Sequence, residues 1–482
     1  MTMVNVLANE FGCLGDSPDD SNSNLPIDPL LPHLPLAFDL QAVCGRFAAE
    51  LSGWRISDCR IAFSKYHPRR NCYVCYRLTL TGGEGSAAFV QHVTVLWCHG
   101  GDAARRAESA LRKVVVQSHA GPAISCWPLL DAVLWWFPND PRLEEPALLE
   151  DMTRLRCQSL DAVVSCLSNG RGELIDHHVA LVQYVPGRRV CARVDLNYRV
   201  CPEFAPLAVS MYVKADVERR GAQTHAVMAA LTDGAAQRSG HLNTPVSLLW
   251  QPGVALHWQL ACQGRTLNAG GAGVLVDEVR RVGESLAGFH ATPVPLARSY
   301  DEAELRTRLM ESRHLLSLVE PGWQTQADRI VDSLLHGAGR VASSPLATLH
   351  GDLHPGNILD DNGRLIFIDL DSVRVGPAVV ELGAWVGDML YRATLCRTPI
   401  PDVSAFWRAF LQAYREQGGF AYEEPQLAWC VAYHLFCRRA CGGVASLKPG
   451  RYQAVPFLLR IAEHLSTADS LDVLAGDTAR SQ

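Results

Sequence analysis

Two short apolar runs in the second half of the chain end at polar residues. Leu346 to Leu349 lead into His350, and Leu365 to Ile368 lead into Asp369. Runs of this length that stop at polar residues predict short buried strands. Between them, residues 360–363 read Asp-Asp-Asn-Gly, a dense turn signal. We therefore expect the chain to reverse there and to bring the two strand ends together.

Two other strand-like patterns resemble each other. The segments "KYHPRRNCYVCYRL", which begins at Lys65, and "QYVPGRRVCARVDL", which begins at Gln183, share a Tyr-x-Pro start, an arginine pair and a strand-like tail. They lie 118 residues apart. We interpret them as a divergent internal repeat. The alternative is two unrelated strands with similar turns.

The two copies differ after the shared segment. The second copy continues into an apolar strand that ends at Lys214 and then into a helical pattern, whereas the first has Gln91 or apolar residues where a lysine would fall. A compact ammonium on a flexible stem suits phosphate oxygens, and a lysine that snorkels at a strand end is the alternative. We therefore interpret residues 41–165 as a non-catalytic cap.

Helical and irregular patterns complete the outline of the chain. Apolar residues recur at helical spacing from Val276 to Phe289 and predict an amphipathic helix, with His290 as a helix-end residue rather than a catalyst. Residues 13–36 are rich in Asp, Ser, Asn and Pro, so residues 1–40 are expected to form a flexible leader. The proline-rich segment from Trp135 to Pro146 is expected to close the cap.

Composition narrows the class of protein. The 482 residues are 48% hydrophobic and 20% charged, with a net charge of −6, as in a globular protein without a general attraction for nucleic acid. We find no apolar stretch of membrane-spanning length and no signal-peptide pattern at the start, so a cytoplasmic protein with no membrane partner is expected. The 16 cysteines are expected to be mostly small buried residues, and Cys72 and Cys75 lack further ligands at zinc spacing.

The polar residues near the two strand ends suit a cation. Asp352, Asn357 and Asp369 supply two carboxylates and one amide oxygen, the ligands that Mg²⁺ prefers. His350-Gly351-Asp352, four further residues and Asn357 fit the kinase catalytic-loop form H-x-D-x-x-x-x-N. Each residue alone is more often a solvated turn residue or a cap. The joint pattern is much less common, and it favours a kinase-like site.

The segment "HGDLHPGNIL", followed by "IDLD", resembles the catalytic segment of the aminoglycoside phosphotransferase and choline kinase superfamily, the phosphotransferase enzyme family. The resemblance implies an α+β, two-lobed protein-kinase-like fold. The nucleotide lobe would span residues 166–258, and a mostly helical catalytic lobe would span residues 259–482. The N-terminal α/β cap would be an addition to this fold and a degenerate repeat of the nucleotide lobe.

The resemblance also implies a reaction. A γ-phosphoryl group would move from ATP or GTP to a hydroxyl of a small molecule, such as an amino alcohol, a sugar or an aminoglycoside-like compound. Asp352 would accept the hydroxyl proton, while Asn357 and Asp369 would hold Mg²⁺. Lys214 would orient the phosphates of the nucleotide, and His350 would orient the catalytic loop.

The sequence departs from the family pattern at three points. The helix after Lys214 offers only Gln223, Thr224 and His225 where a glutamate partner for the lysine is expected. Neither G-x-G-x-x-G nor G-x-x-x-x-G-K-[ST] appears in the chain, which excludes a P-loop NTPase. Glu381 stands where the family usually has an aspartate, and we expect it to serve as a structural cap.

A second hypothesis comes from another class of protein. A catalytically degenerate nucleotide-binding or scaffold protein of the same fold is favoured by the missing lysine partner and the unmarked phosphate loop. Asp371 has no assigned role, and the sequence does not decide the acceptor or the oligomeric state. Four residues of the catalytic lobe are candidates for the acceptor pocket and are equally credible as core or surface residues: Trp385, Asp388, Tyr391 and Arg438.

Overall fold

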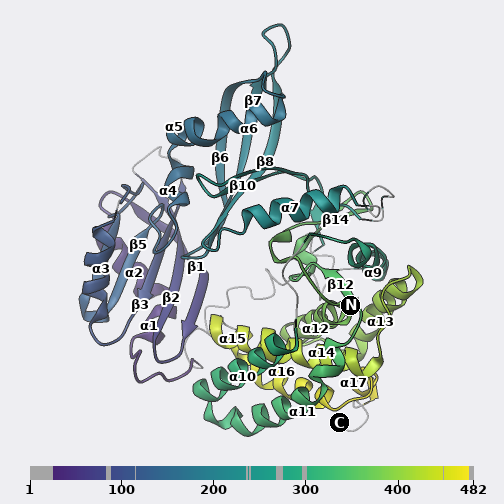
Figure 1. Ribbon diagram of the computed structural model, residues 1–482. Helices are drawn as coiled ribbons and strands as arrows, with labels where there is room; N and C mark the ends of the chain where they lie inside the picture. Colours follow the sequence, from purple (N-terminus) through teal and green to yellow (C-terminus); the bar gives the residue numbers. More distant parts are fainter. Residues whose placement is uncertain are drawn as a thin grey trace.

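The computed structural model describes residues 25–82, 88–113, 115–234, 237, 240, 242–267, 275–295, 301–448 and 450–476. This part of the chain forms two five-stranded sheets and a helical lobe (Figure 1). The first sheet lies to the left in the figure, the second at the top, and the helical lobe at the lower right. Among the described helices, none is both long enough and apolar enough to cross a membrane.

The first sheet is antiparallel and has the strand order β1-β2-β3-β5-β4. Because successive side chains of a strand point to opposite faces, Trp97 shares an apolar cluster with α2, while its neighbour Leu96 packs with α3. Helices therefore cover both faces. The elements are α2 (Leu40–Glu50), β1 (Arg55–His67), β2 (Asn71–Thr81), β3 (Phe89–Trp97), α3 (Asp102–Leu111), β4 (Ile124–Trp127) and β5 (Ala132–Trp136).

The second sheet has the same strand topology as the first. Its order is β6-β7-β8-β10-β9, again with antiparallel neighbours, and a helix again separates its third and fourth strands. The added cap and the two-lobed architecture predicted from the sequence are thus confirmed. The elements are α4 (Glu145–Glu150), α5 (Met152–Leu155), η3 (Arg156–Leu160), α6 (Asp161–Leu167), β6 (Glu173–Val185), β7 (Arg189–Arg199), β8 (Leu207–Asp216), α7 (Gly221–Thr232), β9 (Ser247–Gln251) and β10 (Leu256–Leu260).

Each sheet carries the same polar corner, built around one aspartate. In the first, Asp28 Oδ2 accepts hydrogen bonds from the hydroxyl of Tyr66 at 2.8 Å and from a backbone N–H of the β1–β2 turn at 2.7 Å. In the second, Asp140 Oδ2 accepts from the hydroxyl of Tyr184 at 2.6 Å and from a backbone N–H of the β6–β7 turn at 2.8 Å. Both aspartates stand in a P-x-D-P-x-L sequence. The repeat therefore extends upstream of each first strand.

This corner corrects two expectations from the sequence. The segment from Trp135 to Pro146 does not simply close the cap, because Asp140 within it anchors the second sheet. The boundary predicted at residue 165 falls inside α6. Leu155, Leu160 and other apolar residues of α4 to α6 share the core of the second sheet. We therefore assign the start of the second unit to about residue 138 rather than 166.

The registers of the two sheets identify the counterpart of Lys214. Tyr66 pairs with Cys72 and Tyr184 pairs with Val190, which aligns β2 with β7. One residue further along these strands, Tyr73 pairs with Leu96, and Cys191 pairs with Lys214. The first copy therefore has the buried side chain of Leu96 where the second has the lysine.

The expected leader is only partly described. Residues 1–24 lie outside the described residues, and residues 25–40 do not behave as a leader. Helix α1 (Leu34–Phe38) forms there, and Leu31 and Leu34 are buried in the core of the first sheet. The prolines of the segment predicted an irregular leader, but its apolar side chains recur at short intervals. The segment is ordered because burial of each of these side chains is favourable in free energy.

The catalytic lobe is mostly helical and holds the largest apolar core of the described residues. Helix α12 is buried along most of its length, as expected for a helix surrounded by others. The predicted helix from Val276 is confirmed as α9. The helices are α9 (Val276–Ala291), α10 (Glu302–Val319), α11 (Gln324–Ala342), α12 (Ala378–Leu395), α13 (Ile400–Glu416), α14 (Glu424–His434), α15 (Cys441–Ser446), α16 (Arg451–Ser466) and α17 (Val473–Gly476).

The first sheet touches the catalytic lobe as well as the second sheet. The hydroxyl of Ser64 on β1 donates to the backbone oxygen of Ser446, at the end of α15, and Lys448 Nζ lies 3.5 Å from the backbone oxygen of Ala62. Leu447 is buried within the apolar cluster of the first sheet. Cys75 of the first sheet also packs with Tyr184 of the second sheet, so the cap contacts both lobes of the kinase-like fold, beside which it lies in Figure 1.

Candidate active site

The segment from His350 to Asp369 lies among short strands of the catalytic lobe. The two predicted strands are present as β12 (Leu346–Leu349) and β14 (Arg364–Phe367). The turn at residues 360–363 is also present, but it joins β14 to an unpredicted strand, β13 (Ile358–Asp361). β12 instead pairs with β15 (Arg374–Pro377). The two predicted strands therefore belong to two separate sheets rather than to one hairpin.

His350 links the two strand ends. Its Nε2 donates to the backbone oxygen of Ile368 at 2.9 Å, and its side chain is buried. Gly351 follows with a φ of +81°, and a Cβ there would lie 2.3 Å from the backbone oxygen of Ser372. Only glycine fits this close approach without a shift of the backbone. The contacts of His350 agree with its expected role in orienting the loop.

Glu381 supports the same loop from α12. Its carboxylate accepts the backbone N–H groups of His350 at 2.9 Å and Gly351 at 2.7 Å, and it lies 3.1 Å from His290 Nε2. Burial tends to raise the pKa of Glu381, but the bonds from His290 and from the loop outweigh it and lower the pKa below its usual value. Glu381 therefore acts on the backbone of the loop, as a structural cap does.

Asp352 and Asn357 lie on one side of the candidate site. The Asp352 side chain is exposed, and Asn357 is buried. The Asn357 amide nitrogen donates to the backbone oxygen of Asp352 at 2.9 Å. This bond fixes the amide orientation and leaves the Asn357 side-chain oxygen as an acceptor.

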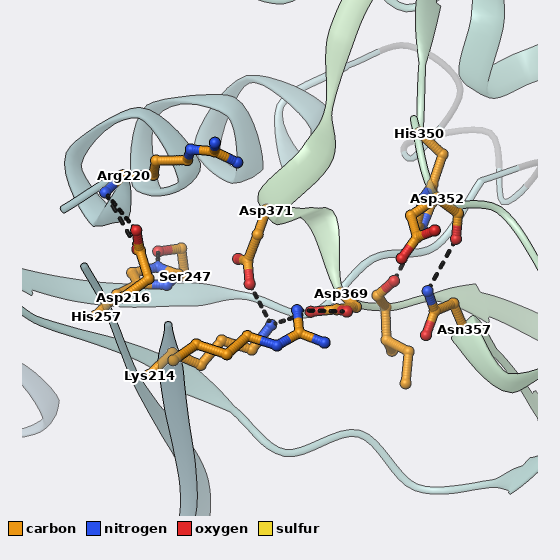
Figure 2. A network of polar contacts seen from close by, with 12 residues as sticks. Lys214, Asp216, Arg220, Ser247, His257, His350, Asp352, Asn357, Asp369 and Asp371 are labelled. Carbon is orange, nitrogen blue, oxygen red and sulfur yellow. Dashed lines mark hydrogen bonds and ion pairs between the residues drawn. The ribbon is translucent and has the colours of Figure 1, made fainter. Parts of the chain in front are cut away.

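Asp369 lies between this pair and Lys214 of the second sheet (Figure 2). Its Oδ1 is 2.7 Å from Lys214 Nζ, and its Oδ2 is 3.6 Å from an Arg189 nitrogen. Lys214 Nζ is also 3.1 Å from Asp371 Oδ2. Asp369 has a φ of +61°, a conformation that non-glycine residues rarely adopt and that is frequent at functional sites.

The charges of this cluster shift one another's pKa. Burial has the largest effect on Lys214 and lowers its pKa, but Asp371 and Asp369 outweigh it and raise the pKa above its usual value. Burial tends to raise the pKa of Asp369, yet Lys214 and Arg189 bring it below its usual value. Asp371 is the exception, because burial outweighs the attraction of Lys214 and its pKa is raised.

The side of Lys214 that faces α7 differs from the family pattern, as the sequence suggested. His257, the strand neighbour of Lys214, lies 2.7 Å from the Ser247 hydroxyl, which lies 2.7 Å from His225 of α7. The helix is thus tied to His257 rather than to the lysine. Burial and the positive charge of Lys214 lower the pKa of His257 to about 3, so it is neutral beside the ammonium.

Two residues near Lys214 escaped the sequence reasoning. Asp371 had no assigned role, and its carboxylate is an acidic partner of the lysine. Arg189 belongs to the arginine pair of the repeat, at the start of β7, and reaches Asp369. The arginine pair was visible in the sequence, but only the fold shows that the β6–β7 turn lies over the site.

The four candidates for the acceptor pocket separate clearly. Trp385 stacks on Phe410 in the core, and Tyr391 is buried. Asp388 is buried and forms ion pairs with Arg392 and Arg439. Arg438 is exposed, next to the catalytic loop. These contacts assign Trp385 to the core and leave Arg438 as the accessible candidate.

Relatives of known name cover only part of the chain. "Stress response kinase A" of Salmonella choleraesuis is 33% identical over 113 residues, which are 22% of this chain and 34% of that protein. "Glucosamine kinase" of Mycolicibacterium smegmatis is 34% identical over 113 residues, which are 22% of this chain and 28% of that protein. The chain thus spans about a third of the length of the curated relatives it matches.

Solved structures of low sequence identity cover a larger share. The aminoglycoside phosphotransferase APH(4)-Ia aligns with a TM-score of 0.42 at 13% identity, over 65% of this chain and 99% of that one. A choline/ethanolamine kinase family protein from Mesorhizobium loti aligns with a TM-score of 0.38 at 12% identity, over 65% and 95%.

A family model matches the segment that contains the site. Residues 197–427 match the model of the phosphotransferase enzyme family. The matched range includes Lys214, the catalytic loop and Asp369. This match confirms the resemblance to the phosphotransferase enzyme family that the catalytic segment predicted.

Proposed function

We propose that this protein transfers the γ-phosphoryl group of ATP or GTP to a hydroxyl of a small molecule. The observation that carries the proposal is the approach of Lys214 to Asp369 at 2.7 Å, which joins the second sheet to the catalytic lobe beside Asp352 and Asn357 (Figure 2). A phosphate-binding cation, cation ligands and a proton acceptor at one place form the set that phosphoryl transfer requires.

The residues at the site fit a magnesium ion that is shared with phosphates. The Asn357 amide nitrogen is engaged by Asp352, so its oxygen is the free ligand atom, and Asp369 supplies a carboxylate. Within the described ranges no three His, Cys, Asp or Glu side chains gather into a metal cluster. This agrees with Mg²⁺, which is usually held by one or two protein ligands together with phosphate oxygens and waters.

The proposed reaction assigns one task to each residue. The acceptor oxygen forms a bond to the γ-phosphorus, the bond to the β–γ bridging oxygen breaks, and the nucleoside diphosphate leaves. Asp352 accepts the proton of the acceptor hydroxyl. Asn357 and Asp369 would hold Mg²⁺, which neutralises charge on the phosphates when bound. Lys214 would orient the phosphates as a point charge.

The acceptor class does not follow from the relatives. Their names include a stress response kinase and a glucosamine kinase, and each matches only part of its length. A catalytically degenerate binding protein of the same fold is the second candidate, favoured by the absence of a glutamate partner for Lys214 on α7. The Lys214 contacts with Asp369 and Asp371 weaken that argument, because the lysine has acidic partners from the other lobe.

Asp352→Asn separates these two candidates. The change keeps the size of the side chain but removes the proton acceptor, so transfer should fall by about 10² to 10⁴-fold while Mg·ATP affinity stays within a few-fold. Slow ATP hydrolysis, with water as the acceptor, serves as the assay alongside a panel of hydroxyl compounds. Asp332→Asn, at an exposed position on α11, is the matched control. Equal rates for Asp352→Asn and wild type would contradict the proposal.

A further inference from the structure

The wall of the site next to the catalytic loop contains an irregular helical turn. Between α14 and α15, residues Leu435–Ala440 form a π-helix, η7, which includes Arg438 and Arg439. A π-helix holds an extra residue in its turn, and such turns are frequent at functional sites. Arg438 and Arg439 are consecutive in this turn and have different partners, the backbone of Gly351 and the side chain of Asp388.

Arg439 contacts Asp388, the buried acid of this wall. Arg392 Nε lies 2.7 Å from one oxygen of Asp388, and Arg439 contacts the other oxygen. Asp388 is only 2% exposed. Because both of its oxygens are engaged by arginines, Asp388 is not available to bind the ammonium group of an amino alcohol or an amino sugar.

Arg438 has a different environment. It is exposed, and its Nη2 lies 3.5 Å from the backbone oxygen of Gly351, the residue before Asp352. In the part of the chain that the structure describes, no carboxylate lies within ion-pair distance of this guanidinium. A guanidinium presents a planar fork that matches the oxygens of a carboxylate or a phosphate.

The histidine of this wall adds no positive charge at neutral pH. His434 Nε2 accepts a hydrogen bond from Arg439 Nε at 3.1 Å. Burial and the nearby Arg438 lower the pKa of His434 to about 3. The arginines therefore set the charge that an acceptor meets on this side of Asp352.

We propose that the acceptor carries an anionic group, a carboxylate or a phosphate ester, which Arg438 binds while the acceptor hydroxyl lies at Asp352. The inference rests on the proposed phosphotransferase function and adds the class of its acceptor. An amino alcohol or an aminoglycoside has the opposite charge and would meet the guanidinium as a like charge, which disfavours its binding.

The test compares acceptors of matched skeleton. Transfer from Mg·ATP is measured to three kinds of acceptor. The anionic acceptors are glycerate, gluconate and glucose 6-phosphate, and their neutral counterparts are glycerol and glucose. The cationic acceptors are ethanolamine and glucosamine. The proteins are wild type, Arg438→Gln, Arg438→Lys and the control Arg60→Gln, a change at an exposed arginine of β1 that pairs with Asp58. Glycerate and gluconate represent the carboxylate source, and glucose 6-phosphate represents the phosphate source.

We expect wild type to have a higher kcat/KM for the anionic acceptors than for the neutral and cationic ones. For each pair, we divide the kcat/KM of the anionic acceptor by that of its neutral counterpart. Arg438→Gln should lower this ratio by about 10- to 100-fold, the range for a lost charged hydrogen bond. The change should arise mainly in KM, and Arg438→Lys should restore part of it. Arg60→Gln should leave the ratio unchanged.

Two other results have separate meanings. Transfer confined to neutral or cationic acceptors, or a ratio that Arg438→Gln does not change, overturns the anionic acceptor and leaves the phosphotransferase intact. Absence of transfer to every acceptor, together with ATP hydrolysis that does not depend on Asp352, overturns the proposed function and this inference with it.

Discussion

Lys214 Nζ lies 2.7 Å from Asp369 Oδ1, although the two residues belong to different lobes of the molecule. The lysine comes from β8 of the second sheet, and the aspartate follows β14 of the catalytic lobe. Both side chains are largely shielded from solvent, with exposed fractions of 16% and 23%. Removal of either partner leaves the other with one remaining ion pair, to Asp371 for the lysine or to Arg189 for the aspartate, in a site that screens charge poorly. This pair therefore joins the two lobes, and the proposed function gives both residues a role in nucleotide binding as well.

Asp369→Ala should weaken the Mg²⁺-dependent part of ATP binding by about 1 to 3 kcal/mol, because a charged contact is lost. Calorimetric titration of the protein with ATP, once in the presence of Mg²⁺ and once in the presence of a chelator, gives the Mg²⁺-dependent part of the binding free energy as the difference. Asp332→Ala, on the exposed face of α11, should behave as wild type. If ATP binds equally with and without Mg²⁺ in both wild type and Asp369→Ala, the assignment of Asp369 as a metal ligand fails.

The duplicated corner offers a matched pair of variants. Asp28→Ala and Asp140→Ala each remove the acceptor of a buried tyrosine hydroxyl and of a turn N–H, so each should lower the free energy of unfolding by about 1 to 3 kcal/mol. Only Asp140 anchors the turn that precedes Arg189. Asp140→Ala should therefore weaken Mg·ATP binding several-fold, and Asp28→Ala should not.

Denaturant unfolding and calorimetry on the two variants check this pair. Equal loss of nucleotide affinity in both would show that the first copy takes part in nucleotide binding. That result would contradict its interpretation as a non-catalytic cap.

Glu381→Gln should impair the catalytic loop through its backbone. Glutamine can accept one of the two backbone bonds from His350 and Gly351, but its amide nitrogen cannot accept the other. Since Glu381 is 3% exposed, we expect a loss of about 1 to 3 kcal/mol in the free energy of unfolding and a lower kcat with little change in KM for ATP. Glu311→Gln, at an exposed position of α10, is the control. An unchanged kcat for Glu381→Gln would exclude this support of the loop.

Acid should destabilise the protein before its carboxylates titrate. His92, His257 and His434 have their pKa lowered, mainly by burial, from 6.5 to about 4, 3 and 3. Below pH 6.5 the unfolded chain binds protons that the folded chain does not bind, so stability falls as the pH drops from 6.5 toward 4.

The size of this effect can be measured residue by residue. Between pH 7 and pH 5, each of these histidines contributes a loss of about 1 to 2 kcal/mol. His434→Gln should reduce the difference between the two pH values by that amount in denaturant unfolding, whereas the exposed His336→Gln should leave it unchanged. A stability that does not vary between pH 7 and pH 5 would contradict the neutral state of these side chains.

Local patterns were sufficient for part of the fold. The apolar run of β12 has the predicted bounds, and β14 is displaced by one residue from its predicted start. β13 was missed because only Ile358 and Leu359 in it are apolar, too few to mark a strand. The partner of β12 was missed because β15 contains Gly376 and Pro377, which are unfavourable in strands.

Contacts between distant residues were beyond the sequence. Asp371 and Lys214 are 157 residues apart, and their approach depends on how the lobes pack rather than on any local pattern. The P-x-D-P-x-L repeat is present in the sequence, but its two occurrences are 112 residues apart, whereas the two tyrosines are 118 residues apart. An alignment of the two copies at a constant spacing of 118 residues therefore does not match the two motifs. Helices α4 to α6 were assigned to the cap because the apolar pattern of a helix does not show which sheet it packs against.

The first sheet connects the second sheet with the helical lobe. On one side it encloses Leu447 of the catalytic lobe, and on the other its Cys75 packs with Tyr184 of the second sheet. The proposed phosphotransferase would close and open its two lobes around a nucleotide, as kinases do. Such a rotation must pull Leu447 out of the first sheet or slide Tyr184 past Cys75. The first sheet, which has Leu96 at the position of Lys214, would then limit how far the two lobes separate, and under the proposed function its two contacts would resist nucleotide exchange.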